Sequence, residues 1–366
     1  MPASDSRYIV SDVGVRVEEI AFRSGSDADR EAFHELTCAV QRESRPDDPL
    51  PTLEMSKALL DSVPDSIDVA AFVVRGETGG FDGLGYALLF RTDDNEHMTQ
   101  IEIVVHPERR RRGIGTALLG ALAEAAERDG RRLLMGSTSE RVPAGAAFAQ
   151  AVGAEPGLDA HTNRLVLDEV DRELVDRWIT DGPRRAPGYE LVAIDGLYPD
   201  DLLEEIVSCH NIMNTAPRDD LELDDRTMTP AFVREMESFL SGQGLERWSL
   251  FARHTASGSL VGYTEVSWNA EQPETVQQMA TAVHPDQRGH ALGKWLKATM
   301  LIRILDERLA AGAIDVRTGN ADSNAAMLGI NHALGFRSFI AATTWQVSVD
   351  RAKSFVGSRT EAPAGA

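Results

Sequence analysis

The positions of apolar and polar residues predict a chain in which strands and helices follow one another. Runs in which apolar residues alternate with polar ones are typical of strands, and apolar residues three or four positions apart are typical of one helix face. In the first half, this pattern predicts strands over residues 13–22, 67–74, 84–90, 98–105 and 132–135 and helices over 27–42, 113–126 and 144–152. This order of elements is typical of the α/β class.

The same order of elements begins again in the second half. Here the pattern predicts strands over 189–194, 248–253, 260–267, 275–283 and 314–317 and helices over 199–212, 230–240, 291–304 and 327–334. Short motifs repeat as well, since His284-Pro285 follows His106-Pro107 by 178 residues and Val261-Gly262-Tyr263 follows Leu84-Gly85-Tyr86 by 177. A nearly constant offset indicates an internal repeat, and its length is too great for a solenoid.

Two related domains are therefore predicted, over residues 1–179 and 189–353. Each is long enough to bury a hydrophobic core of its own. Residues 180–188 are rich in turn-forming residues and lack apolar periodicity, so we expect a linker there. Residues 354–366 are expected to form a flexible tail.

The strand predicted over 98–105 leads into a basic turn that contains glycines and then into a helix. The first turn of a helix has unpaired N–H groups and a partial positive charge, and glycine lets a ligand approach the backbone, so this turn is suited to phosphate. Two common phosphate-binding motifs do not fit. Leu118 stands where the dinucleotide fingerprint needs its third glycine, and Thr116 stands where the phosphate loop needs lysine.

Composition limits the class of protein and of ligand. The net charge is −21 and the dense basic run is confined to 109–112, so we expect no nucleic-acid surface. We expect a cytoplasmic protein without membrane contact, since the sequence has no apolar run of about 18 residues and no apolar leader. No metal is expected, because the spacing of His, Cys and carboxylates matches no metal motif. The acidic surface fits either cationic substrates or simple solubility.

Arg110, Gly113 and Gly115 form the pattern R-x-x-G-x-G, and residues 288–293 nearly repeat it. This pattern resembles the coenzyme A pyrophosphate loop of the GNAT N-acetyltransferase superfamily. The doubled order of elements resembles the tandem GNAT proteins of the actinobacterial type, and the similarity to mycothiol synthase is architectural. The resemblance implies an α/β fold of two tandem GNAT-like domains. Each would have a mixed, mostly antiparallel sheet with a splayed central strand, flanked by helices.

The resemblance also implies which residues bind acetyl-CoA. The free backbone of the splayed strand would pair with the pantetheine arm at Ile103, Val104 and Val105 in the first domain and at Thr281, Ala282 and Val283 in the second. The pyrophosphate would lie on Arg110, Arg111, Arg112, Gly113, Ile114, Gly115 and Thr116, and in the second domain on Arg288, Gly289, His290, Ala291, Leu292, Gly293 and Lys294. Ala291 replaces the middle glycine of the motif, and alanine can occupy the first turn of a helix.

A further superfamily pattern places two groups on the last helix: an amide that binds pantetheine and a tyrosine that protonates the departing thiolate. In the second domain, Asn324 and Gly335-Phe336 match this pattern, but Asn331 occupies the tyrosine position. The first domain has Ala149 there. Because neither domain carries the usual acid, Asn331 is kept as a candidate catalytic residue, and water or another residue must protonate the sulfur.

The candidate bases for the amine lie on the strands around the splay. Glu265 is a candidate to face the substrate cleft and take the amine proton, directly or through water, and the alternative is a solvent-facing strand carboxylate. Glu102 is the similar candidate in the first domain. Tyr86 and Tyr263 occupy matching strand positions, where each either acts as a thiolate acid or packs in the sheet.

These features predict an N-acetyltransferase that moves an acetyl group from acetyl-CoA to a primary amine of a small molecule by direct attack in a ternary complex. The second domain retains Asn324 and is the expected catalytic domain. One alternative is a catalytically silent module that binds coenzyme A for sensing. Another is a mycothiol-type enzyme that acetylates a cysteinyl amine. We expect a monomer or a homodimer.

Overall fold

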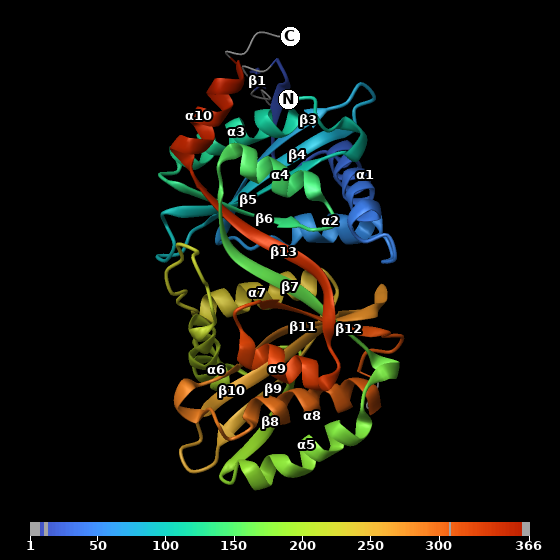
Figure 1. Ribbon diagram of the computed structural model, residues 1–366, viewed down its shortest axis with the longest axis vertical. Coiled ribbons are helices and arrows are strands. Elements are labelled where there is room, and N and C mark those ends of the chain that lie inside the picture. The colour runs from blue at the N-terminus through green and yellow to red at the C-terminus, as the bar shows by residue number, and fades with distance from the viewer. Residues whose placement is uncertain (1–7, 11–13, 307–308, 361–366) are drawn as a thin grey trace. The chain divides into compact units, whose positions relative to one another are not determined.

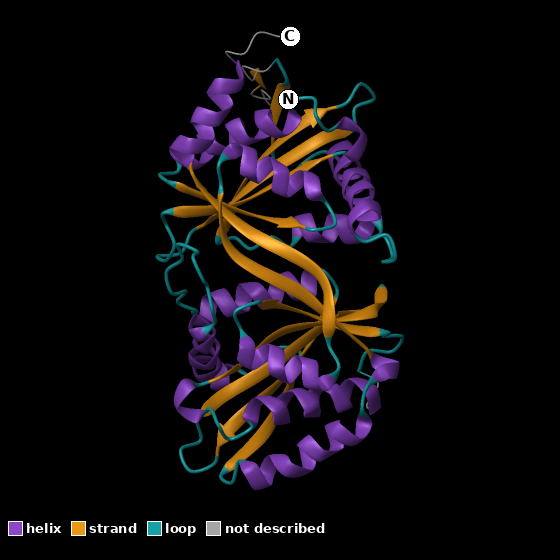
Figure 2. Ribbon diagram, viewed as in Figure 1, coloured by secondary structure: helices purple, strands orange, loops and turns teal. Residues whose placement is uncertain are grey.

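The computed structural model describes residues 8–10, 14–306 and 309–360. The chain forms two compact units, and neither is a single continuous stretch of sequence. The first unit comprises Met1–Leu158, Asp220–Asp224 and Ala342–Ala366, and the second comprises Asp159–Asp219 and Asp225–Ala341. Each unit is a sheet with helices on both faces (Figure 2). The predicted α/β class and the mixed, mostly antiparallel sheets are therefore confirmed.

The sheet of the first unit has the strand order β1-β2-β3-β4-β5-β6-β13. The bounds are β1 Tyr8–Val10, β2 Arg16–Ile20, β3 Ile67–Arg75, β4 Phe81–Phe90, β5 Met98–Val105, β6 Leu133–Ser139 and β13 Arg337–Ser348. Neighbouring strands are antiparallel except for β5 and β6, which are parallel.

Helices cover both faces of this sheet (Figure 1). Their bounds are α1 Asp27–Ser44, α2 Leu53–Asp61, α3 Ile114–Arg128, α4 Pro143–Val152 and α10 Val349–Thr360. Successive side chains of a strand point to opposite faces, so Phe72 of β3 packs with α3 and Val73 packs with α1. The apolar positions of α3, including Leu118 and Leu122, are buried against the strands as their helical spacing predicts.

The second unit repeats this plan with the strand order β7-β12-β11-β10-β9-β8. The strands are β7 Glu155–Val166, β8 Tyr189–Asp195, β9 Leu245–His254, β10 Leu260–Asn269, β11 Gln272–Val283 and β12 Asp315–Ala321. The helices are α5 Arg172–Arg185, α6 Leu203–His210, α7 Pro230–Gly242, α8 Leu292–Asp306 and α9 Ala325–Leu334. α5 and α8 pack on one face of the sheet, and α6 and α7 pack on the other. The parallel pair here is β11 and β12.

Two long strands exchange places between the halves of the sequence. β13 comes from the C-terminal half, but its residues 342–348 pair with β6 in the first unit. β7 comes from the N-terminal half, but its residues 160–166 pair with β12 in the second unit. Each unit therefore takes a strand from the other half of the sequence, and β13 leads directly into α10 of the first unit.

Removal of residues 342–366 is expected to destabilise the first unit strongly. The deletion removes the partner strand of β6 and also Val349, Ala352 and Phe355, which are buried against α3 and β6. Burial of three such apolar side chains is worth about 5 kcal/mol, so the thermal midpoint of this unit should fall by about 10 °C or more. Calorimetry measures this change. A chain ending at Thr360 is the control, and an unchanged midpoint in the longer deletion would contradict the role given to β13 and α10.

The segment expected to be a linker is helical over most of its length. Residues 180–185 belong to α5, and the second compact unit begins at Asp159 rather than at residue 189. The reason is packing: Gly182 lies so close to Trp295 of α8 that a Cβ atom there would come within 2.4 Å of the indole. The glycine that resembled a turn former is the residue that lets α5 pack on α8.

The tail also differs from expectation. Residues 354–360 are the second half of α10 and pack on α3, whereas residues 361–366 lie outside the described residues. Val349 lies among buried residues of α3 and α4, so an apolar face of α10 holds the helix in place. The segment is short, and too few of its apolar residues recur at helical spacing for the sequence to predict the helix.

Candidate active site

The glycine turn of the first unit has the backbone geometry of an open helix N-terminus. It connects β5 to α3, and two of its residues have positive φ angles: Arg111 at 64° and Gly113 at 82°. Gly113 is the N-cap of α3 and provides no side-chain hydrogen bond to the helix. The N–H groups of the first turn of α3 therefore have no capping side chain, which suits an anionic ligand.

The arginines of this turn divide into two kinds. Arg110 donates to the Glu43 carboxylate of α1 at 2.6 Å, and Arg109 lies 3.2 Å from Asp82. Arg111 and Arg112 are exposed. The side chain of Arg110 is therefore bound to the protein, so its contribution to an anion site would come from its backbone, while Arg111 and Arg112 are accessible to a ligand.

The second unit has the same turn between β11 and α8, 178 residues later. Gly289 has a φ of 88° and Ala291 a φ of 62°, so the left-handed positions match those of Arg111 and Gly113. Arg288 donates to the Val283 carbonyl at 3.1 Å and to Thr215 at 2.9 Å. The sequence predicted that Ala291 lies in the first turn of the helix, but Ala291 precedes the helix. Alanine is strained in this conformation, and glycine is not.

The two turns give a matched pair of stability predictions. Ala291→Gly is expected to increase the free energy of unfolding by about 1 kcal/mol, because it relieves a positive φ. Gly113→Ala is expected to decrease it by about the same amount for the opposite reason. Urea denaturation of each variant measures both changes. A lower stability for Ala291→Gly would show that the φ of Ala291 is not strained.

In both units the strand before the turn separates from its parallel neighbour. β5 pairs with β6 only at Met98, Thr99 and Gln100, although its ladder with β4 continues to Val105. β11 pairs with β12 only from Thr275 to Gln277, although its ladder with β10 continues to Val283. The predicted splay is therefore present twice. The residues beyond each short ladder have a strand edge that can pair with an extended ligand. They include Ile103, Val104 and Val105 in β5, and Thr281, Ala282 and Val283 in β11.

β11 also carries a β-bulge just past the point of separation. Thr264 faces Thr281 and Val266 faces Gln278, so two residues of β11 oppose one residue of β10. The Gln278 side chain is buried and donates to the Glu265 carbonyl at 2.6 Å. β5 has no such irregularity in its ladder with β4. Bulges commonly occur beside active sites, where they redirect a strand.

Glu265 lies at this bulge and is part of a buried polar cluster. It is only 6% exposed, so it is not the solvent-facing carboxylate that was the alternative reading. Its carboxylate accepts hydrogen bonds from Tyr198 and from Ser249, the latter at 2.9 Å, and lies 3.6 Å from the His210 ring. His210 stands at the C-terminal end of α6 and its ring lies 4.7 Å from that of Tyr263. We call Tyr198, His210, Ser249 and Glu265 the carboxylate cluster.

The surroundings of the carboxylate cluster shift several pKa values. Burial lowers the pKa of His210, although the nearby Glu265 acts in the opposite direction, so the imidazole is favoured in its neutral form. Burial and the Glu265 charge raise the pKa of Tyr198 and of Tyr263. Arg247 lies 3.6 Å above the Tyr198 ring and pairs with Glu237 at 2.6 Å. The cluster thus offers proton acceptors at neutral pH but no tyrosine that readily gives up a proton.

The first unit has a simpler arrangement at the corresponding strands. Glu102 of β5 lies directly opposite Tyr86 of β4. Glu102 is exposed, and desolvation by the surrounding protein atoms raises its pKa. Burial and the Glu102 charge raise the pKa of Tyr86. Leu88 stands on β4 at the position that Glu265 has on β10, so the first unit lacks the carboxylate cluster.

The two asparagines of the last helix have structural contacts. Asn324 is the N-cap of α9, where its side chain accepts a hydrogen bond from the Met327 N–H at 3.2 Å. Asn331 is completely buried and donates to Asn320 at 2.7 Å. An asparagine amide is not an acid, and the buried position keeps Asn331 away from solvent, so its assignment as a catalytic residue has no support in these contacts.

Sequence reasoning missed Tyr198, His210 and Ser249. Tyr198 follows β8, His210 ends α6 and Ser249 lies on β9, and no sequence motif connects three positions that meet only through tertiary packing. It also missed Lys297, which is buried on α8. A signal for Lys297 did exist. It lies three residues before Met300 and four before Leu301, both of which are buried, so helical spacing places a charged residue on the apolar face.

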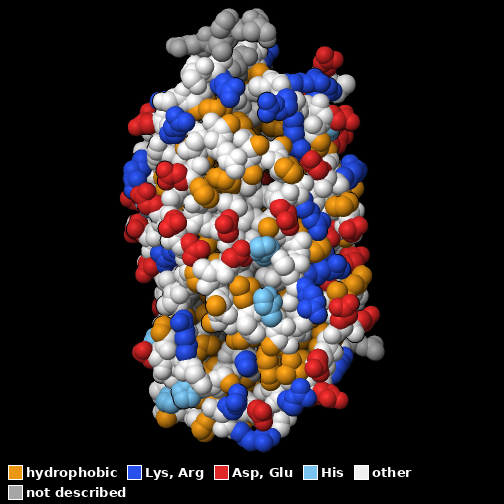
Figure 3. Space-filling model, in the orientation of Figure 1, with side chains coloured by type: hydrophobic (Ala, Val, Ile, Leu, Met, Phe, Trp, Pro, Cys, Tyr) orange, Lys and Arg blue, Asp and Glu red, His pale blue; other side chains and the backbone are white. Residues whose placement is uncertain are grey.

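Three further features concern the residues that the structure describes. No group of three or more His, Cys, Asp or Glu residues there is arranged to hold a metal ion. Across residues 8–10, 14–306 and 309–360, no helix combines the length and the apolar character needed to cross a bilayer. The face in Figure 3 shows acidic and basic side chains interspersed, without an extended basic patch.

Comparison with known proteins shows which proteins the chain is similar to. Residues 69–153 match the family model described as an acetyltransferase (GNAT) domain. No curated protein sequence matches the chain. Among solved structures, the chain is similar to a tandem GNAT protein from the clavulanic acid biosynthesis pathway, with 27% identity over 91% of this chain and 98% of that one and a TM-score of 0.73.

A second structure, a GCN5-related N-acetyltransferase from Sphaerobacter thermophilus, has 16% identity over 90% of this chain and 96% of that one, with a TM-score of 0.60. At this identity it supports the fold alone. The chain therefore contains a GNAT acetyltransferase domain over residues 69–153, shares the fold of a tandem GNAT protein over 91% of its length, and is an acyltransferase.

Proposed function

We propose that the chain transfers an acetyl group from acetyl-CoA to the primary amine of a small molecule, and that the second unit is the catalytic one. The observation that carries this proposal is the buried carboxylate cluster beside the bulge of the splayed strand β11. A GNAT-type reaction needs a proton acceptor next to the thioester, and the first unit has a leucine at the corresponding position of β4.

Acetyl-CoA supplies the activated thioester, and the chain's residues position it. The N–H groups at the start of α8, reached through Gly289, Ala291 and Gly293, would hold the diphosphate. The backbone of Thr281, Ala282 and Val283 would pair with the pantetheine arm along the edge that β12 leaves open. Backbone N–H groups on this edge would also bind the developing oxyanion.

Proton transfer falls to the carboxylate cluster. Glu265 receives the proton of the attacking amine, with neutral His210 3.6 Å away as a second acceptor. Tyr198 and Ser249 hold one carboxylate oxygen by hydrogen bonds, which leaves the other oxygen toward His210. The acidic composition of the chain favours a cationic amine, which must lose a proton before it attacks.

The first unit has the glycine of the motif at Gly113 and an uncapped α3, so we propose that it binds coenzyme A without catalysing transfer. Ile114, Gly115 and Thr116 would supply its N–H donors, and the exposed Arg111 and Arg112 would supply its positive charge.

In the second unit, the residues around the corresponding turn include His290, Leu292 and Lys294. Lys294 lies 5.0 Å above the Trp178 ring, and His290 lies 5.6 Å from the Tyr189 ring.

The test is acetyl-CoA turnover with a panel of amines that includes amino acids, amino sugars and a cysteinyl amine. Release of free thiol together with an acetylated product, identified by mass spectrometry, would support the enzyme. Product formation with the cysteinyl amine alone would identify a mycothiol-type step. Calorimetric binding of acetyl-CoA without turnover of any amine would overturn the enzymatic proposal in favour of a coenzyme A binding module.

A further inference from the structure

Lys297 is a buried amine without a hydrogen-bond partner. It lies on α8 in the second unit, is 3% exposed, and its Nζ contacts no acceptor among the residues that the structure describes. The Phe336 ring lies 5.2 Å from Nζ. A buried ammonium normally has a partner, because desolvation of an unpaired charge is costly. The corresponding residue of the first unit is Leu119, which is an ordinary core residue.

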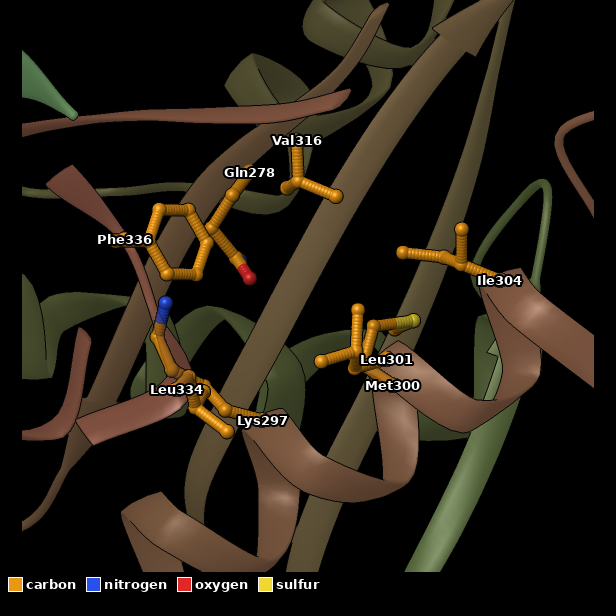
Figure 4. A pocket seen from close by; sticks show the side chains of 8 residues that line it. All are labelled: Gln278, Lys297, Met300, Leu301, Ile304, Val316, Leu334 and Phe336. Carbon is orange, nitrogen blue, oxygen red and sulfur yellow. The ribbon is translucent and has the colours of Figure 1, made fainter. Parts of the chain in front are cut away.

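The amine lines a small cavity (Figure 4). The cavity volume is about 10 Å³, which is the room needed for about one water molecule. Met300, Leu301 and Ile304 of α8 form its apolar end, and the amine lies at the other end, near Phe336 and the Gln278 amide. A single water there would have both a donor and an acceptor within the lining.

The cavity lies where β11 and β12 separate. The ladder between these strands ends at Gln277 paired with Arg317, and Gln278, the next residue of β11, lines the cavity. The Gln278 side chain also donates to the Glu265 carbonyl. Glu265 is held by residues packed on the α6 face of the sheet, whereas Lys297 comes from α8 on the opposite face. Glu265 and Lys297 therefore lie on opposite faces of the sheet, near the point where β11 and β12 separate.

We propose that Lys297 is the proton donor to the thiolate of coenzyme A in the second unit. This inference rests on the proposed function. When the amine attacks the thioester, the new C–N bond forms and the C–S bond breaks. The proton of the amine passes to Glu265, and the Lys297 ammonium gives its proton, directly or through a water molecule taken up by the cavity, to the departing sulfur. Coenzyme A leaves as the free thiol. Before the next turnover, Glu265 releases its proton to solvent and Lys297 takes one up.

The environment of Lys297 matches this role. Burial lowers its pKa from 10.5 to about 7, and no charged side chain contributes to the shift. The groups that face the amine from β11, β12 and the end of α9 are the Gln278 amide, Val316 and Phe336, none of which titrates. A thiol has a pKa of about 8.5, so transfer from this ammonium to a thiolate is favourable. Asn331, at the position where a tyrosine acid would stand, cannot supply the proton.

The test uses the small number of lysines. The chain contains Lys57, Lys294, Lys297 and Lys353, so ¹³Cε-lysine labelling gives four NMR signals, and the Lys297→Met variant assigns one of them. That signal is expected to titrate near pH 7 in the free protein. It should titrate at a higher pH with coenzyme A than with desulfo-coenzyme A, because only the former places a thiolate near the ammonium. Equal midpoints with the two bound ligands would overturn the proposal.

Kinetics give the second readout. Lys297→Met, which keeps an unbranched side chain in the apolar site, should lower kcat at least tenfold with little change in the KM for acetyl-CoA. It should also remove the fall of kcat as pH rises through about 7, which reflects loss of the donor proton. Lys353→Met on the surface of α10 is the matched control and should behave as the unaltered protein. An unchanged kcat and pH profile in Lys297→Met would contradict the assignment.

Failure of this inference can be distinguished from failure of the proposed function. If the second unit binds coenzyme A and transfers acetyl groups but Lys297 neither senses the thiol nor affects kcat, then the donor is a different group. If calorimetry finds no coenzyme A bound to the second unit, both the proposed site and the donor are wrong.

Discussion

Leucine in place of Gly115 or Gly293 is expected to abolish coenzyme A binding in the affected unit and to leave the other unit unchanged. Both glycines lie in the first turn of a helix, whose N–H groups we propose as ligands of the diphosphate. A large side chain would keep the phosphates away from these donors. Loss of two hydrogen bonds to a charged group costs about 3 kcal/mol or more, so the affinity should fall at least about 100-fold.

Calorimetric stoichiometry measures this effect directly. If both units bind, each single variant should lose one of two sites, and the double variant should lose both. A Cβ at Gly115 would lie 3.7 Å from Phe148, which is an ordinary contact, and a Cβ at Gly293 would lie 3.2 Å from the end of the Ile330 side chain, so circular dichroism checks that both variants fold. Gly357→Leu in α10, where a Cβ meets nothing within 4 Å, is a matched control. Unchanged stoichiometry in the double variant would show that these turns are not the binding sites.

Glu265→Gln is expected to lower kcat by about 100- to 10,000-fold, the usual contribution of a general base. The glutamine keeps an oxygen that can accept hydrogen bonds from Tyr198 and Ser249, so the variant should remain folded. The KM for acetyl-CoA should change little, because Glu265 lies on β10 and not on the open edge of β11 that we propose for the pantetheine arm. Steady-state kinetics at saturating acetyl-CoA provide the measurement, and circular dichroism checks the fold.

The control for this variant is Glu102→Gln in the first unit. Glu102 lies on β5, the splayed strand of the first unit, opposite Tyr86, and this unit has Leu88 where the second unit has Glu265. Glu102→Gln should therefore retain nearly full activity. The opposite result, a large loss in Glu102→Gln and a small one in Glu265→Gln, would assign the chemistry to the first unit and refute the role of the carboxylate cluster.

Local patterns predicted most of the fold. The periodicity of apolar residues correctly gave the strands before each turn and the helices after them, because each of these elements buries one regular face. The internal repeat indicated two domains, yet the boundaries differ. β7 and β13 pair with strands from the other half of the sequence, and no local pattern specifies a partner so far away. Gly182 and Pro183 resembled a linker because the requirement for space beside Trp295 is tertiary.

The sequence predicted only the part of the candidate site that local patterns specify. The glycine turns and the splayed strands follow from contiguous motifs, and the structure contains both. The strain at Ala291 depends on its φ angle, which the motif does not report. The burial of Glu265 depends on Tyr198, Ser249 and His210, which come from separate segments of the second unit. Groups that become functional only through long-range packing are beyond the reach of sequence patterns.

The exchange of β7 and β13 has a consequence for synthesis on the ribosome. Proteins made from the N-terminus usually complete their first domain before the next one is translated. Here β6 cannot receive its neighbouring strand until residues 342–348 have left the exit tunnel, after almost all of the second unit. In the nascent first unit, the edge of β6 therefore stays unpaired while the second half is translated. A chaperone that shields such edges would be needed longest during this period.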